Sequence, residues 1–181
     1  VSEALRSPDT VHKLFFGDGT DNPYQLEEIA EAMEYLNCVQ ALGIIFDSKH
    51  VNENNNISNV LKSTHNLHSV LFHMGNDFAF MDSSDLHYIS QNKQLSGLAW
   101  MNTKISTFPE EFWSLSKLKS IAIFCPVVSQ GYLDKHLSPQ IGKLQNLEIL
   151  SIDCPNLVDL PKELYSLKKL QELTLYQYPE D

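Results

Sequence analysis

Apolar residues recur along this chain with a fixed spacing: one apolar residue is followed by a second three positions later and by a third two positions after that. These triplets begin at residues 11, 39, 67, 95, 118, 147 and 170, so consecutive starts are 28, 28, 28, 23, 29 and 23 residues apart. Every marked position is apolar, although hydrophobic residues make up only 43% of the chain. The triplets are Val11, Leu14 and Phe16; Val39, Leu42 and Ile44; Leu67, Val70 and Phe72; Leu95, Leu98 and Trp100; Leu118, Ile121 and Ile123; Leu147, Leu150 and Ile152; and Leu170, Leu173 and Leu175.

This spacing predicts one strand in each repeat. The second and third residues of a triplet are two positions apart, so they point to the same face of a strand. A single strand cannot bury that face, whereas a stack of repeats forms a parallel sheet with a continuous core behind it. We therefore expect seven parallel strands, with Leu98 and Trp100 facing the core. A further check agrees, since an apolar residue lies six positions before each start: Leu5, Met33, Leu61, Ile89, Phe112, Ile141 and Leu164.

The segments that connect the strands differ along the chain. Residues 24–39 place apolar side chains at helical spacing and glutamates on the other side, which predicts a helix with a solvated acidic face. Segments 108–112 and 160–164 are short and contain proline, which favours 3-10 turns or nearly extended chain. We expect loops at the polar tract 52–56 and at residues 126–136. The glutamates are Glu27, Glu28, Glu31 and Glu34.

Two segments near the C-terminus carry a family resemblance. Residues 144–152 read LQNLEILSI and residues 157–170 read LVDLPKELYSLKKL. They resemble leucine-rich repeats, and the LPxxLxxLxxL form is similar to the repeats of intracellular immune receptors and bacterial repeat proteins. The resemblance implies an α/β leucine-rich repeat solenoid. Such a fold is a curved horseshoe, here with about seven parallel strands on its concave face and helices, 3-10 turns or extended segments on its convex face.

The repeats predict a single array over residues 1–181, with 28-residue repeats at about 11–94 and 23- to 29-residue repeats at about 95–181. The family usually has Asn or Cys at the ninth position of each strand segment, where the side chain bonds neighbouring backbones in a ladder. This chain has neither residue there, so we expect the ladder to be absent or displaced. Neither end shows a polar cap, so we expect a fragment of a longer protein or a partner that covers one end.

The charge balance narrows the choice of partners. Thirteen Lys and Arg against 23 Asp and Glu make the net charge −10. Nucleic acids and anionic membranes attract proteins through lysine and arginine, so we expect neither as a partner. No window of 18 consecutive apolar residues is present, so nothing in the sequence predicts a membrane span. These features leave the oligomeric state open.

No combination of residues predicts catalysis. The chain has no phosphate-binding glycine-rich loop and no HExxH or GxSxG motif, so we expect a protein that is not an enzyme and uses no cofactor. His65, His68 and His73 are close in sequence, but no carboxylate or cysteine accompanies them at ligand spacing. A metal site is therefore not expected.

The cysteines bear on the cellular compartment. Their number, three, is odd, and no Cys-x-x-Cys pair is present. This favours reduced thiols and a cytoplasmic location, because disulfides are rare in reducing compartments. Cys125 and Cys154 nevertheless occupy equivalent positions in consecutive repeats, with Cα atoms expected about 5 Å apart and within disulfide range. The sequence leaves open whether they can pair.

Recognition through the concave sheet face is the function that most solenoids perform. Alternate strand positions place an apolar stripe on that face, and contiguous exposed apolar residues mark interaction sites. An opposing interpretation is that Phe46, Met74 and Phe124 tuck into the strand ends and serve packing only. The residues that we expect to bind a protein or peptide are Ile45, Phe46, Leu71, His73, Met74, Met101, Phe124 and Tyr176.

Three further functions stay open at this stage. The chain is also compatible with the substrate-recognition region of a larger enzyme, such as a bacterial effector ligase, or with the sensor region of an intracellular immune receptor. A GTPase-activating or inhibitor-type array is suggested only by the 28-residue repeats. That function needs a well-placed arginine or an inhibitory surface, and the only arginine, Arg6, lies near the start of the chain.

Overall fold

The fold is described from a computed structural model. The described residues are 11–17, 26–36, 38–46, 57–74, 79–81, 83–101, 103–105, 108–124, 136–154, 157 and 159–176. The expectations for Leu5, the polar tract 52–56, Cys125 and the loop up to residue 135 lie outside them, as do those for the side chains of Glu27, Phe46 and Met74.

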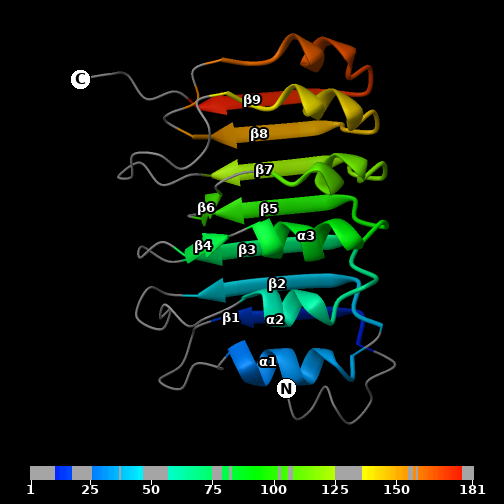
Figure 1. Cartoon of the computed structure of the whole chain (residues 1–181), viewed down its shortest axis with the longest axis vertical. Coiled ribbons are helices and arrows are strands. Elements are labelled where there is room, and N and C mark those ends of the chain that lie inside the picture. Colours follow the sequence, from blue (N-terminus) through cyan, green and yellow to red (C-terminus); the bar gives the residue numbers. More distant parts are fainter. Residues whose placement is uncertain are drawn as a thin grey trace, which may run out of the picture.

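Seven parallel strands form one open sheet, as the triplets predict (Figure 1). Their spatial order follows their order in the chain. The register aligns each triplet with the next, so that Leu98 of β5 lies between Val70 of β3 and Ile121 of β7. The strands are β1 (Lys13–Gly17), β2 (Ala41–Phe46), β3 (Ser69–Met74), β5 (Gly97–Met101), β7 (Ser120–Phe124), β8 (Ile149–Asp153) and β9 (Glu172–Tyr176).

The connecting segments change from α-helix to 3-10 helix along the chain. The first three are α1 (Leu26–Met33), α2 (Ile57–Lys62) and α3 (Ser83–Gln91), and the last three are the 3-10 turns η3 (Glu110–Ser114), η4 (Pro139–Lys143) and η5 (Lys162–Ser166). Each 3-10 turn has a proline at or just before its first residue, in agreement with the sequence prediction. Figure 1 shows these helices and turns on one face of the sheet.

A second, two-stranded sheet was not predicted. It pairs β4 (Ala79–Met81) with β6 (Thr103–Ile105) in parallel, just beyond the ends of β3 and β5 (Figure 1). The triplet pattern marks only the strands of the main sheet, so it contains no signal for this short pair.

The core lies between the main sheet and the helices. In β2, β3, β5, β7 and β8 the last two residues of each triplet are at most 3% exposed. Trp100 is fully buried, with its ring centroid 5.9 Å from that of Phe108 and 6.1 Å from that of Phe112. This aromatic group fills the space under the short turn η3 with large rings that pack in tilted arrangements. The prediction that Leu98 and Trp100 face the core is confirmed.

A regular backbone ladder links the repeats at the entry to each strand. The carbonyl oxygen of His12 accepts from the amides of Gln40 and Ala41, at 2.8 and 3.1 Å. The carbonyl of Gln40 accepts in the same way from His68 and Ser69, and the arrangement recurs up to β9. Backbone groups thus satisfy one another between repeats, which they must do wherever they are removed from water.

Buried Asn92 adds a side-chain link between two repeats. Its Oδ1 accepts from the Leu67 amide at 2.9 Å, and its Nδ2 donates to the Tyr88 carbonyl at 3.1 Å and to Thr64 Oγ1 at 3.4 Å. Asn92 is 0% exposed, so its amide is satisfied by protein groups rather than by water. This asparagine precedes its strand, whereas the family's ladder position follows it.

Candidate protein-binding face

The sheet face opposite the helices is the candidate site. Strand β5 shows why: Leu98 and Trp100 are buried, whereas the residues that alternate with them, Gly97, Ala99 and Met101, are partly exposed. Side chains alternate between the two faces of a strand, so the same alternation in the other strands creates three rows that cross the sheet. We call these rows together the open face; it corresponds to the concave face expected from the sequence.

The first row contains most of the predicted binding residues. In register order it runs through Ile45, His73, Met101 and Phe124, each from the next strand along the sheet. Neighbouring members are about 4.8 Å apart, the spacing of strands in a sheet. Ile45 is 38% exposed, whereas the other three are half-buried. The row continues through Asp153 to Tyr176, which is 52% exposed.

The middle row contains two large apolar side chains and several small ones. Phe15 and Leu71 flank Gly43, and beyond Leu71 the row continues with Ala99 and Ala122. Phe15 is 61% exposed, making it one of the most exposed large apolar residues among those described. Ala99 and Ala122 are partly exposed, whereas Gly43 is buried beside the Phe15 ring. A segment of a partner lying across β5 and β7 therefore has room next to Met101 and Phe124.

Two exposed apolar residues were missing from the predicted set. Phe15 lies between the second and third residues of its triplet, as Leu71 does in its own. The register therefore already placed Phe15 on this face. Ile149 of β8 is 37% exposed and lies in the third row, at the first position of its strand. Strand alternation was a sufficient signal for both, because residues two positions apart share a face.

The histidines do not form a metal site. Within the described ranges, no group of three or more His, Cys, Asp or Glu side chains is arranged to hold a metal ion. His73 belongs to the open face, whereas His65 lines a groove on the helix side. The absence of a metal or cofactor requirement stays a prediction.

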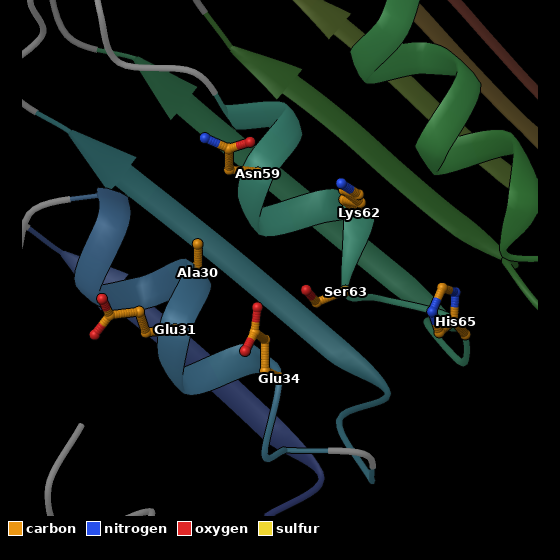
Figure 2. A pocket seen from close by; sticks show the side chains of 7 residues that line it. All are labelled: Ala30, Glu31, Glu34, Asn59, Lys62, Ser63 and His65. Carbon is orange, nitrogen blue, oxygen red and sulfur yellow. The ribbon is translucent and has the colours of Figure 1, made fainter.

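A polar pocket lies between α1 and α2, away from the open face (Figure 2). Its volume is about 550 Å³. Glu31 of α1 and Glu34 just after it line one side, while Asn59 and Lys62 line the other side from α2. These four side chains are exposed, so water already solvates their charges and amides. The pocket's lining mixes polar and apolar surface, and its exposed glutamates agree with the solvated acidic helix face that the sequence predicts.

The cysteines differ from the sequence expectation. Cys38 is a free thiol, but Cys154 is disulfide-bonded and only 3% exposed. The expectation that all thiols are reduced is therefore wrong for Cys154. That expectation rested on the odd number of cysteines, which does not prevent two of three from pairing.

A solved structure shares this fold. A leucine-rich repeat protein of Leptospira interrogans aligns with a TM-score of 0.62 and 22% sequence identity, over 96% of this chain and 39% of that one. Its likeness, with the seven-stranded parallel sheet, establishes the leucine-rich repeat solenoid fold for this chain. No protein-family model and no curated protein matches the sequence. Among the described helices, none is long and apolar enough to cross a membrane.

Proposed function

We propose that this chain is a non-catalytic protein- or peptide-binding module whose partner covers the open face. The observation that carries the proposal is the exposure of apolar side chains on that face, chiefly Phe15 and Ile45 on the neighbouring strands β1 and β2, and Tyr176 on β9 at the other end of the sheet. Covering apolar surface contributes about 25 cal/mol per Å² of area removed from water. Phe and Met side chains, represented here by Phe124 and Met101, are also enriched in the centres of protein interfaces.

The proposal competes with the interpretation that Phe124 serves packing only. Phe124 is half-buried, between Met101 of β5 and Asp153 of β8 in the register. Partial burial fits an anchor that a partner completes, and it also fits a residue that only covers the sheet. The two interpretations differ in what truncation does, since an anchor controls affinity and a packing residue controls stability.

A random peptide library displayed on phage tests the proposal directly. The library is panned against the wild-type chain after depletion on a variant that carries Ile45→Asp and Phe124→Asp. We expect enriched peptides that bind the wild type and do not bind the variant. A variant with Glu28→Lys and Glu31→Lys on exposed α1 is the matched control, and it should bind like the wild type. Enrichment of peptides that need the acidic helix instead would contradict the proposal.

Two kinds of longer protein would use the same face for binding. In the first, the chain would be the substrate-recognition region of an enzyme such as a bacterial effector ligase. In the second, it would be the sensor region of an intracellular immune receptor. The chain spans about two fifths of the length of its structural neighbour. The full-length sequence discriminates between these settings, since each requires a different flanking domain. Nucleic acid and membrane are not expected as partners in any of them.

The cellular compartment is a separate part of the proposal. A cytoplasmic location follows from the cysteine count alone, whereas the bond at Cys154 favours an oxidising compartment. The test is to alkylate the thiols of protein taken from its natural source under denaturing conditions and before reduction, so that Cys154, which is buried, reacts if it is a free thiol. Three labelled cysteines would support the cytoplasm. A single labelled cysteine, Cys38, would place the protein in an oxidising compartment.

A further inference from the structure

Four turns of the same form line one edge of the sheet, where strands β5, β7, β8 and β9 begin (Figure 1). In each turn the amide of the first triplet residue donates to the carbonyl oxygen three residues earlier, at 2.9 to 3.2 Å. Backbone hydrogen bonds also join successive turns, such as the bond from the Glu148 amide to the Lys119 carbonyl at 2.7 Å. We call these segments the entry turns; they are residues 92–96, 115–119, 144–148 and 167–171.

The entry turns are basic, although the chain as a whole is acidic. They contain five lysines and one carboxylate, so their net charge is +4, while that of the remaining chain is −14 and the total is −10. Neighbouring strands are about 4.8 Å apart, so this positive charge is concentrated along about 14 Å of the edge. The lysines are Lys93, Lys117, Lys119, Lys168 and Lys169, all exposed, and the carboxylate is Glu148.

Most of these lysines keep their charge available to a partner. Among the described residues, Lys119 forms an ion pair with Glu148 at 3.1 Å, whereas the other four donate to neutral acceptors. An ammonium group has three donors, so a lysine that is bonded to a neutral oxygen can still bind a carboxylate. The four bonds run from Lys93 to Ser114 Oγ at 2.9 Å, from Lys117 to Gln94 Oε1, from Lys168 to the Tyr165 carbonyl at 3.2 Å, and from Lys169 to Asn146 Oδ1 at 2.5 Å.

Two of these bonds also hold lysines in place along the edge. Lys117 is bonded to a residue of the turn before its own, and so is Lys169. Asn146 completes the connection, because its Nδ2 donates to the Ser116 carbonyl at 2.7 Å. A side chain that is already fixed loses less conformational freedom when it binds, so these two lysines are well prepared to receive an anionic group.

We propose that the entry turns bind an acidic peptide segment of a partner protein. An extended peptide rises about 3.3 Å per residue, so four or five residues cover the basic edge. Carboxylates of such a segment would pair with Lys117 and Lys169, and further ones with Lys93 and Lys168. This surface is separate from the open face, so the inference goes beyond the proposed function and does not rest on it.

The charge distribution favours a short acidic segment over nucleic acid. A nucleic acid strand carries a phosphate at every nucleotide and would extend past the basic edge onto a chain whose remaining net charge is −14. Like charges repel there, which would offset the attraction at the entry turns. A peptide can confine its carboxylates to four or five residues and flank them with neutral side chains.

Fluorescence anisotropy of the whole chain with labelled hexaglutamate tests the proposal. We expect binding at low salt that weakens as sodium chloride is added, because salt screens exposed charges. Lys117→Glu combined with Lys169→Glu should raise Kd about tenfold or more, since two attractive pairs become repulsive. Lys117→Gln combined with Lys169→Gln keeps a donor at both positions and should weaken binding less. Circular dichroism checks folding, and the glutamine variant carries the test if the glutamate variant unfolds.

Matched controls separate this surface from general charge effects and from the open face. Lys62→Glu combined with Lys162→Glu changes the net charge equally, at exposed lysines outside the entry turns, and should bind hexaglutamate like the wild type. Ile45→Ser combined with Phe124→Ser removes apolar groups of the open face without changing the charge, and should also bind normally.

Three results would overturn the proposal. The first is a wild-type chain that does not bind hexaglutamate at low salt. The second is a loss in either control variant as large as that in the Lys117→Glu, Lys169→Glu variant, which would assign binding to net charge or to the open face. The third is tighter binding of single-stranded hexathymidylate than of hexaglutamate, which would make nucleic acid the partner.

Discussion

The phenyl ring of Phe15 on β1 occupies the space that a side chain at Gly43 on β2 would fill. A Cβ atom built on Gly43 overlaps the ring edge and lies 3.2 Å from its Cγ. The two residues are register partners in the middle row of the open face. Glycine at position 43 thus lets an exposed aromatic side chain lie flat across the neighbouring strand.

This contact predicts that the effect of Gly43→Ala depends on Phe15. Alanine in a strand is favoured over glycine by about 0.5–1 kcal/mol through backbone entropy. In a Phe15→Ala background we expect Gly43→Ala to raise the free energy of unfolding by that amount. In the wild type the displaced ring should cancel or reverse the gain. Urea denaturation of the four proteins of this double-mutant cycle measures the coupling, and strictly additive effects would contradict the contact.

Trp100 should be among the residues most important for stability. It is 0% exposed and packs against Phe108 and Phe112. Trp100→Ala should cost about 3–5 kcal/mol of unfolding free energy. Trp100→Asp should cost more, because it adds an unpaired buried charge. Thermal melting measures both, with Tyr35→Asp, at an exposed turn just after α1, as the control. A near-wild-type melting temperature for Trp100→Asp would contradict the buried position.

Asn92 should contribute to stability through hydrogen bonds rather than through apolar packing. Asn92→Ala leaves the Leu67 amide without its acceptor in a buried setting, which typically costs about 1–3 kcal/mol. Asn59→Ala, on the exposed side of α2, should change the unfolding free energy little. Chemical denaturation measures both variants. Hydrogen exchange adds a local readout, since the Leu67 amide should exchange faster in Asn92→Ala only.

Phe124 should affect binding more than folding. If it anchors a partner peptide, Phe124→Ala should cost about 2 kcal/mol of affinity, which is roughly a thirtyfold rise in Kd. Its stability loss should be far smaller than that of Trp100→Ala, because Phe124 is partly exposed already. Glu28→Lys should alter neither quantity. Fluorescence anisotropy with a selected peptide, paired with thermal melts, gives both. A large stability loss with unchanged affinity would support the packing interpretation.

Metal removal should leave the protein unchanged. No cluster of potential ligands is present in the described ranges, and the sequence shows no ligand spacing. We therefore expect the same melting temperature before and after dialysis against a chelator. Stoichiometric zinc in protein purified without added metal, together with a lower melting temperature after chelation, would contradict this prediction.

Much of the fold could be predicted because the repeat pattern reports burial directly. The triplet positions of Leu98 and Trp100 follow from a period-two strand that faces a core, and neither position depends on distant parts of the chain. The prolines before η3 and η5 likewise indicated short turns by a local steric effect. The pair of β4 and β6 could not be predicted, since each has only three residues and depends on the neighbouring repeat for its hydrogen bonds.

The open face was predicted in outline, and its details required the folded chain. Strand alternation alone assigns Ile45, Met101 and Phe124 to one row, because successive side chains point to opposite faces. Exposure, by contrast, depends on what lies beside each residue. The same triplet positions are buried in β8 and partly exposed in β9, because among the described strands β8 has a neighbour on both sides and β9 has one only. The repeat register placed Cys154 within disulfide range of Cys125, but only the folded chain decided that Cys154 is bonded.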